Sequence, residues 1–303
     1  MKILLSGGTG FIGSALRESL TAKGYEVTIL TRRMSLENHP GVRTRYVYWN
    51  PSEGGTWERE LDGVDGVINL AGEPIVGKRW SARQKKKILE SRTGAARSLV
   101  KAIQNARRRP FFHLNASAVG YYGPRQDEEL HEDSPSGRGF LAETCKAWEA
   151  EAQQAESLGV RLIRLRIGIV LAKGGGALGK MLAPFQLGLG GPLGTGRQWM
   201  SWIHREDLIH LVHFLLERKE ARGVYNATAP SPVTMKEFTQ TLGRVLHRPA
   251  FFPVPSFVLK GLLGEMADML LTGQRVLPKR ALQAGFSFKF PRLEPALQEI
   301  LKK

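Results

Sequence analysis

The sequence predicts an α/β protein, in which a doubly wound parallel sheet is joined to a smaller C-terminal substrate lobe. The first half of the chain alternates short apolar runs with helical patterns. This alternation is typical of a parallel sheet with helices on both faces. The first apolar run begins at Lys2 and ends in a glycine cluster, inside which a helical pattern starts. After residue 172 the chain changes to a long glycine-rich stretch, followed by helical and irregular segments.

The glycine cluster predicts a dinucleotide site. Gly7, Gly10 and Gly13 are three residues apart, close to the dinucleotide-binding fingerprint. The first glycine allows a sharp turn off the strand, the second a close approach to a pyrophosphate, and the third close packing of helix on sheet. The amides at the helix N-terminus would then face the phosphates. A tight turn without a ligand is the alternative, but a second strand over residues 25–30 follows where the motif requires one.

The end of this second strand predicts which cofactor binds. In NAD-binding versions an acidic residue about 20 residues after the glycines holds the ribose hydroxyls. This chain instead reads Thr31, Arg32 and Arg33. A guanidinium pairs with a 2′-phosphate, which a carboxylate would repel. The sequence therefore favours NADP(H), with solvated loop arginines as the alternative.

The remaining elements follow from the apolar patterns. We predict strands over 44–49, 64–70, 110–117 and 160–171, a basic helix over 81–108, a helix from about residue 139, and helices over 207–216 and 234–246. Asp207 is the expected N-cap of its helix. The predicted organisation is a Rossmann domain over 1–172, a mixed segment over 173–248 with a glycine-rich substrate loop and sheet-completing elements, and a small C-terminal lobe over 249–303.

Composition limits the partners that we expect. The net charge of +16 favours an anionic partner, but the basic runs lack interleaved aromatic residues, so we expect no nucleic-acid partner. No apolar run is long enough for a membrane span, and we expect no membrane partner. Cys145 is the single cysteine and the histidines are scattered, so we expect no metal site. With no room for a cleavable leader before the first strand, we expect a cytoplasmic protein; the oligomeric state stays open.

Several further motifs carry a resemblance to a known family. They are 69–72 (Asn-Leu-Ala-Gly), 116–123 (ending Tyr-Tyr-Gly), 146–150, 188–194, 202–208 (Trp-Ile-His-Arg-Glu-Asp-Leu) and 271–278. With the glycine cluster, they resemble the extended, sugar-nucleotide-epimerase-like short-chain dehydrogenases/reductases. More narrowly, the chain is similar to the atypical NADP-dependent "epimerase family" branch, some members of which are labelled cell-division inhibitors. The resemblance covers nearly the whole chain.

The resemblance implies a set of cofactor-binding positions. Arg92 would face the cofactor from its helix, although a surface arginine is an equal alternative. The pyrophosphate loop would be Gly7, Thr9, Gly10, Phe11, Ile12 and Gly13, the adenosine-phosphate clamp Thr31 and Arg32, the adenosine-side segment Leu70, Ala71 and Gly72, and the nicotinamide wall Gly168 and Val170.

The catalytic pattern of the family is incomplete in this chain. Members of this type usually use a tyrosine, a lysine four residues later, and a serine or threonine. The helix that should carry the first two offers Leu141 and Cys145 in one register and Ala142 and Lys146 in the other. Neither register supplies the tyrosine.

Other residues therefore become the candidates for chemistry. Catalytic candidates are Ser117, Tyr121 and Tyr122, and substrate-binding candidates are Arg197, Gln198 and His204. Three hypotheses remain open: hydride transfer with a substitute acid, reduction of an activated substrate with a proton from solvent, or an NADPH-dependent regulator without catalysis. For the first two, we expect a small, possibly anionic substrate.

Overall fold

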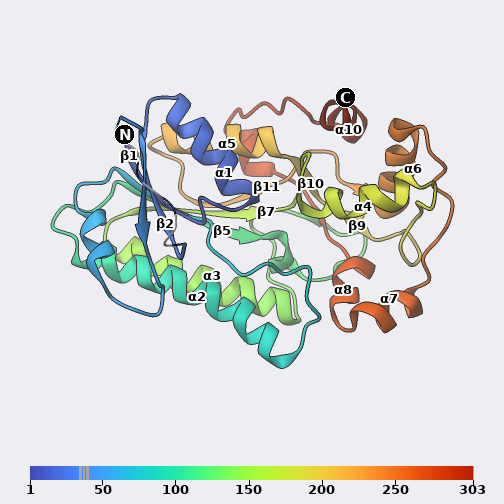
Figure 1. The fold of residues 1–303 in the computed structure, drawn as a ribbon, viewed down its shortest axis with the longest axis horizontal. Helices are drawn as coiled ribbons and strands as arrows, with labels where there is room; N and C mark the ends of the chain where they lie inside the picture. The colour runs from blue at the N-terminus through green and yellow to red at the C-terminus, as the bar shows by residue number, and fades with distance from the viewer. Residues whose placement is uncertain (34–35, 37, 39–40, 303) are drawn as a thin grey trace.

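The computed structural model describes residues 1–33, 36, 38 and 41–302, and its centre is a parallel sheet. Its seven strands have the order β11-β7-β5-β4-β1-β2-β3, and Figure 1 shows helices on both sides of the sheet. Their bounds are β1 Lys2–Ser6, β2 Glu26–Thr31, β3 Thr44–Tyr48, β4 Gly66–Asn69, β5 Phe112–Ala118, β7 Arg161–Ile167 and β11 Gly223–Ala227. All neighbouring strands are parallel, so their carboxyl ends share one edge.

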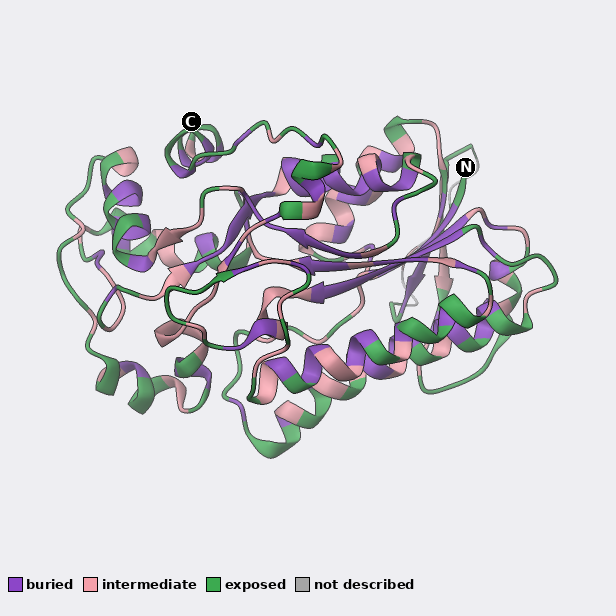
Figure 2. Cartoon of the chain, turned by 180° about the vertical axis from the view of Figure 1, so that it is seen from behind, coloured by how far each residue is buried: buried purple, intermediate pink, exposed green. Residues whose placement is uncertain are grey.

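Helices cover both faces of this sheet because side chains alternate along each strand. Ile3 and Leu5 pack against α1 (Phe11–Ala22) and α5 (Arg205–Glu217), whereas Leu4 packs toward α2 (Ala82–Asn105). The helix α3 (Phe140–Ser157) lies beside α2 on that second face. In Figure 2 the strands are purple and the helices are purple mainly on the side turned to the sheet. The doubly wound sheet predicted from the sequence is confirmed.

Two local predictions need correction. The strand expected over 160–171 is divided at Gly168 into β7 and β8 (Ile169–Leu171), and β8 pairs with β10 (Trp202–His204) outside the main sheet. A Cβ on Gly168 would overlap the Ser201 carbonyl oxygen, so the crossing requires glycine. The N-cap of α5 is His204 rather than Asp207. The buried Asp207 carboxylate instead accepts hydrogen bonds from the amides of Lys289 and Phe290, at 2.7 and 2.9 Å.

The C-terminal region packs around a separate apolar core that includes Trp202 and Phe238. Its main helices are α4 (Gly176–Gln186), α6 (Met235–Leu246) and α10 (Leu293–Leu301), while α7 (Ser256–Leu263) and α8 (Met266–Leu271) contact each other. The smaller elements are β6 Glu129–Leu130 with β13 Arg275–Val276, β9 Trp199–Met200 with β12 Val233–Thr234, α9 Lys279–Gln283, and the 3₁₀ turns η1 Thr56–Leu61 and η2 Val119–Tyr122. In the described part of the chain, no helix is both long enough and apolar enough to cross a bilayer.

Candidate functional site

A glycine cradle stands at the carboxyl ends of β1 and β4. Gly7 has a φ of 74°, and a Cβ there would lie 2.6 Å from the Leu70 carbonyl carbon. A Cβ on Gly13 would overlap the Gly7 carbonyl oxygen and come within 2.8 Å of the Gly8 Cα. Glycine therefore stands at two close backbone contacts: Gly7 against the segment after β4, and Gly13 of α1 against the β1–α1 turn. These contacts bring Leu70 and Ala71 against the predicted pyrophosphate loop.

The N-terminus of α1 is open to an anion. Gly10 is its N-cap, no side chain caps its first turn, and that turn contains no acidic residue. First-turn amides without a partner carry the positive end of the helix dipole and suit a phosphate group. The Phe11 ring is turned away to one side: a Cβ on Gly175 would lie 2.7 Å from it, and the Arg205 guanidinium lies 5.1 Å from its centroid. Ile12 packs on the core below. The cradle therefore fits a pyrophosphate.

Buried polar side chains hold the strand ends beneath the cradle. Ser6 Oγ donates to Asn69 Oδ1 at 2.6 Å, and Asn69 Nδ2 donates to Asn115 Oδ1 at 2.7 Å. The Ala71 amide donates to the same Asn69 oxygen at 3.1 Å. This chain of bonds joins β1, β4 and β5 and fixes the segment after β4. The sequence analysis did not predict it, although an asparagine within each of two apolar strands is a readable signal.

The residues expected to recognise the adenosine phosphate, Thr31 and Arg32, lie at the carboxyl end of β2. Thr31 is buried, and its Oγ1 accepts a hydrogen bond from the Arg33 amide at 3.1 Å. This bond shapes the turn at the carboxyl edge of the sheet. Arg32 is exposed at that turn. Its guanidinium is therefore accessible to a phosphate.

Arg92 is half-buried on α2 rather than on an open helix surface. Its Nη1 donates to the carbonyl oxygens of Glu73 and Ile88, both at 3.0 Å, and its guanidinium lies 5.3 Å from the Trp148 ring centroid. A Cβ on Gly72 would lie 3.0 Å from its Cζ. Desolvation by burial lowers the pKa of Arg92. The side chain therefore connects α2, α3 and the segment after β4, and its predicted contact with a cofactor stays a prediction.

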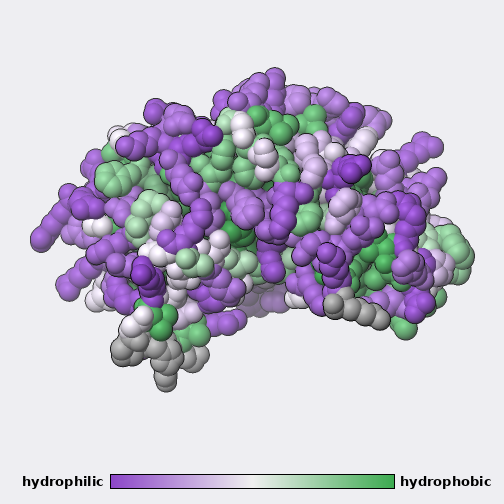
Figure 3. Space-filling view, turned by 90° about the horizontal axis from the view of Figure 1, so that it is seen from above, coloured by the Kyte–Doolittle hydropathy of each residue, from purple (hydrophilic) through white to green (hydrophobic). Residues whose placement is uncertain are grey.

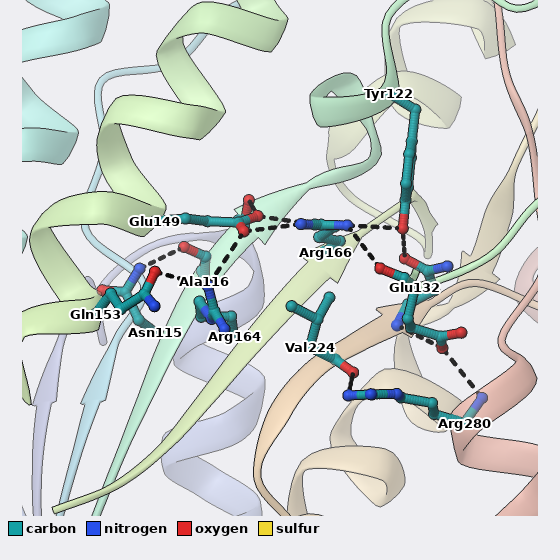
Figure 4. A network of polar contacts seen from close by, with 12 residues as sticks. Asn115, Ala116, Tyr122, Glu132, Glu149, Gln153, Arg164, Arg166, Val224 and Arg280 are labelled. Atoms are coloured by element: carbon teal, nitrogen blue, oxygen red, sulfur yellow. Dashed lines mark hydrogen bonds and ion pairs between the residues drawn. The ribbon is translucent and has the colours of Figure 1, made fainter. Parts of the chain in front are cut away.

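Two of the three catalytic candidates, Ser117 and Tyr122, belong to a buried network, and Figure 4 shows Tyr122 in it with Arg166 and Glu149. Ser117 Oγ donates to Glu149 Oε1 at 2.6 Å, and the Tyr122 hydroxyl donates to Asn226 Oδ1 at 2.7 Å. Desolvation by burial raises the pKa of Tyr122 to about 12. In this structure both hydroxyl groups are therefore engaged by partners within the chain. The catalytic role of Ser117 and Tyr122 stays a prediction.

Arg166 is the centre of the network. Its Nε and Nη2 donate to the two Glu149 carboxylate oxygens at 2.8 and 2.9 Å, and its Nη1 donates to the Tyr122 hydroxyl at 3.0 Å. Burial by itself would lower the pKa of Arg166, but the hydrogen bonds and charge of Glu149 raise it. The pair was missed by the sequence analysis. Arginines at alternate positions of an otherwise apolar strand were the available signal.

Tyr121 is the catalytic candidate that remains accessible. It is half-buried in η2, directly after β5, and its ring lies flat on the Arg166 guanidinium with 3.4 Å between Cζ and the ring centroid. The Tyr122 ring meets it edge-on at 5.4 Å. These two contacts fix the ring plane. Within the described residues no hydrogen bond engages the Tyr121 hydroxyl, so it is available to a substrate oxygen.

The helix that usually carries the tyrosine–lysine pair is inert at those positions. Cys145 is buried, and desolvation raises the pKa of its thiol to about 11. Lys146 forms an ion pair with Glu143 at 2.7 Å, one turn away on the outer side of α3. The expected proton relay is therefore missing from the structure as well as from the motif.

The substrate-binding candidates are not equivalent. His204 is buried, its Nδ1 accepts from the Glu206 amide at 3.2 Å, and its Nε2 lies 3.1 Å from Glu299. It caps α5, and its role in substrate binding stays a prediction. Gln198 Nε2 donates to the carbonyl oxygens of Leu193 and Leu270, while its Oε1 is buried without a partner in the described chain. Arg197 is exposed in the same loop. These two stay substrate candidates.

Two measurable cavities lie away from the glycine cradle. One of about 550 Å³ is lined by α1, α5 and α10 residues such as Ser19, Ile209 and Glu299. The other, of about 740 Å³, lies beside α6 and includes Arg244 and Phe251. Neither cavity is lined by Gly7, Arg92 or Tyr121. Over the described residues, no cluster of three or more metal-ligating side chains occurs.

A doubly wound sheet with a glycine cradle at its carboxyl edge defines a dinucleotide-binding fold of the short-chain dehydrogenase/reductase type. The chain belongs to the NAD-dependent epimerase/dehydratase family, whose model matches residues 3–228. A domain of unknown function (DUF1731) matches residues 254–300. The family resemblance read from the motifs is thereby confirmed.

Individual relatives match the full chain. The chloroplastic SDR39U1 homolog of Arabidopsis thaliana, an epimerase family protein, is 43% identical over 100% of this chain and 87% of that protein. The epimerase family protein YfhF of Bacillus subtilis is 42% identical, over 99% and 98% of the two chains. The crystal structure of human epimerase family protein SDR39U1 with NADPH superposes with a TM-score of 0.88 at 40% identity, covering 99% of both chains.

Proposed function

We propose that this protein binds NADP(H) across the glycine cradle and catalyses slow hydride transfer to or from a small, anionic substrate beside Tyr121. The observation that carries the proposal is the cradle itself, with Gly7 and Gly13 in backbone contact, an uncapped α1 and the exposed Arg32 at one edge. The human relative that was crystallised with NADPH supports the same cofactor. When bound, the nicotinamide would supply or accept the hydride.

In this proposal, different residues of the chain bind the cofactor, donate the proton and bind the substrate. The amides of α1 would hold the pyrophosphate, and Arg32 the 2′-phosphate. Leu70, Ala71 and Gly72 would lie along the adenosine side, and Gly168 and Val170 beside the nicotinamide. Tyr121 would give its hydroxyl proton to the substrate oxygen in the reducing direction. Arg197 would attract the negative charge of the substrate.

The preference for the phosphorylated cofactor rests on Arg32. We expect NADPH to bind at least about tenfold more tightly than NADH, a difference of about 1.4 kcal/mol from contacts to the 2′-phosphate. Arg32→Asp should narrow or reverse this preference, because a carboxylate repels the phosphate. Calorimetric titration with both cofactors measures the effect. Arg59→Asp, which makes the same charge change at an exposed position in η1, is the control. Equal affinities for the two cofactors in the native protein would contradict the assignment.

The proton donor can be tested with a conservative substitution. Tyr121→Phe keeps the stack on Arg166 but removes the hydroxyl, so we expect the turnover rate to fall about 10²-fold, the usual scale of positioned acid–base catalysis. NADPH affinity should stay unchanged. A screen of carbonyl compounds and enones, monitored by NADPH absorbance, finds a substrate first. Tyr48→Phe, at an exposed tyrosine of β3, is the matched control. An unchanged rate in Tyr121→Phe would assign the proton to solvent.

A regulator without catalysis is the second candidate, and one observation favours it. The helix positions of the usual proton relay hold a buried thiol and apolar side chains, as described for Cys145. The same screen, run beside a pull-down with and without NADPH, separates the two functions. No turnover of any compound, together with a partner retained only when NADPH is present, would select the regulator.

A further inference from the structure

Large apolar side chains are concentrated on the outside of the C-terminal lobe. Figure 3 shows hydrophobic atoms exposed at the right-hand end of the molecule, over this lobe. Six large apolar side chains are exposed there, with exposed fractions from 48% for Phe252 to 77% for Phe257. The six are Leu187, Leu189, Phe251, Phe252, Phe257 and Leu262.

These side chains come from two segments that run side by side. The Phe252 amide donates to the Gly190 carbonyl oxygen at 3.2 Å, and the Val254 amide donates to the Pro192 carbonyl oxygen at 2.9 Å. Arg248 Nε donates to the Gln186 carbonyl oxygen at 3.2 Å. The second segment then leads directly into α7, which has one buried residue, Leu259. We call these six side chains, with the exposed Arg248 and Lys260, the lobe-tip surface.

The charge of this surface has one sign. Neither residues 173–201 nor residues 238–264 contain an aspartate or glutamate, although the chain as a whole has 28. Arg248 and Lys260 are exposed, and neither makes an ion pair with any described residue. Exposed Phe and Leu side chains with basic neighbours and no carboxylates are the pattern of a surface that enters the boundary of an anionic bilayer.

We propose that the lobe-tip surface docks the protein reversibly on an anionic lipid surface. A second copy of this chain fits less well, because a two-fold interface would place the same basic residues against each other. A protein partner fits less well because Leu187, Phe251 and Phe257 are each more than two-thirds exposed on loops or on a short helix. Protruding side chains of this kind insert between lipid chains, whereas protein interfaces are close-packed and water-excluding at their centre.

Docking of this kind needs no membrane span. The expectation that the chain has no membrane partner was drawn from the lack of a long apolar run, and it does not bear on a peripheral contact. The lobe-tip surface lies in loops and in α7 and shares no residue with the glycine cradle.

Vesicle co-sedimentation of the full chain tests the proposal. We expect binding to vesicles of phosphatidylcholine mixed with phosphatidylglycerol, and little binding to phosphatidylcholine alone. Raising the salt concentration should weaken it, because exposed charges are screened. The double variant Phe251→Ser, Phe257→Ser should lower the partition coefficient at least about tenfold. The matched control is Phe111→Ser, at a side chain 68% exposed outside the lobe, which should bind like the native protein.

Charge reversal gives a second, independent measurement. Lys260→Glu should weaken binding to the anionic vesicles about fivefold, whereas Lys101→Glu, at an exposed position of α2, should change it little. NADPH affinity, measured for every variant, shows that the fold is intact. Failure of the native protein to bind anionic vesicles would overturn the proposal, as would equal loss in Phe111→Ser. A dimer in solution that dissociates in the double phenylalanine variant would assign the surface to a second copy instead.

Discussion

Gly13→Ala should lower the affinity for NADPH by at least about 100-fold, which corresponds to about 2.7 kcal/mol. The added methyl group would overlap the Gly7 carbonyl oxygen and lie 2.8 Å from the Gly8 Cα. Both are backbone atoms, so the methyl group cannot be accommodated by a side-chain rotation. The β1–α1 turn has to move, and the α1 amides lose the position from which they would face the pyrophosphate.

Calorimetric titration of NADPH measures this loss, and another glycine provides the control. Gly94 lies in the middle of α2, and a Cβ there meets no atom within 4 Å. Gly94→Ala should keep the native affinity and increase stability slightly, because alanine is the better helix former. If Gly13→Ala bound NADPH as tightly as Gly94→Ala does, the cradle would not be the pyrophosphate site.

Arg166→Ala should cost about 3–5 kcal/mol of unfolding free energy, the largest stability effect that we expect from one substitution. It would leave the Glu149 carboxylate, which is 4% exposed, without its two guanidinium hydrogen bonds. Part of that charge would remain compensated by Arg164, whose Nη1 is 4.0 Å from it. Tyr121 would also lose the surface on which its ring rests, so cofactor turnover should fall along with stability.

Denaturant unfolding of three proteins checks this expectation. The double variant Arg166→Met, Glu149→Leu should recover a large part of the lost unfolding free energy, because neither charge then stays buried without its partner. In Arg97→Ala, where the partner Glu151 belongs to a surface ion pair, the loss should stay below about 1 kcal/mol. A loss in Arg166→Ala no greater than that in Arg97→Ala would mean that the buried pair contributes little to the fold.

The sheet was predictable because its signals are local. Each predicted strand is a short apolar run, and each helix shows the spacing of its buried face, as in Leu16 and Leu20 of α1. β11 was anticipated only as a sheet-completing element somewhere in 173–248, because its residues Gly223–Ala227 include a glycine and an asparagine and form no continuous apolar run. The division at Gly168 depends on the distant Ser201, and no pattern along the strand records that contact. The predicted domain boundaries at 172 and 248 stay a prediction.

The cofactor half of the site was more readable than the catalytic half for a similar reason. Gly7, Gly10 and Gly13 are close in sequence, so their spacing carries the geometry. The partners of Ser117 and Tyr122 are Glu149 and Asn226, which are 32 and 104 residues away. The sequence shows that these two hydroxyl groups lie near the end of a strand. It does not show the distant side chains to which they form hydrogen bonds. Tyr121, the neighbour of Tyr122, differs from it only in the side to which its ring turns.

The buried Cys145 thiol can report local opening of the native protein. The thiol is the only one in the chain, is buried beneath η2, and has its pKa raised to about 11 by desolvation. At neutral pH it is therefore neither ionised nor accessible, and alkylating reagents react with the thiolate. Modification must wait until α3 and η2 move apart. The rate at which a thiol reagent labels the native protein consequently measures how often this helix detaches, without any engineered probe.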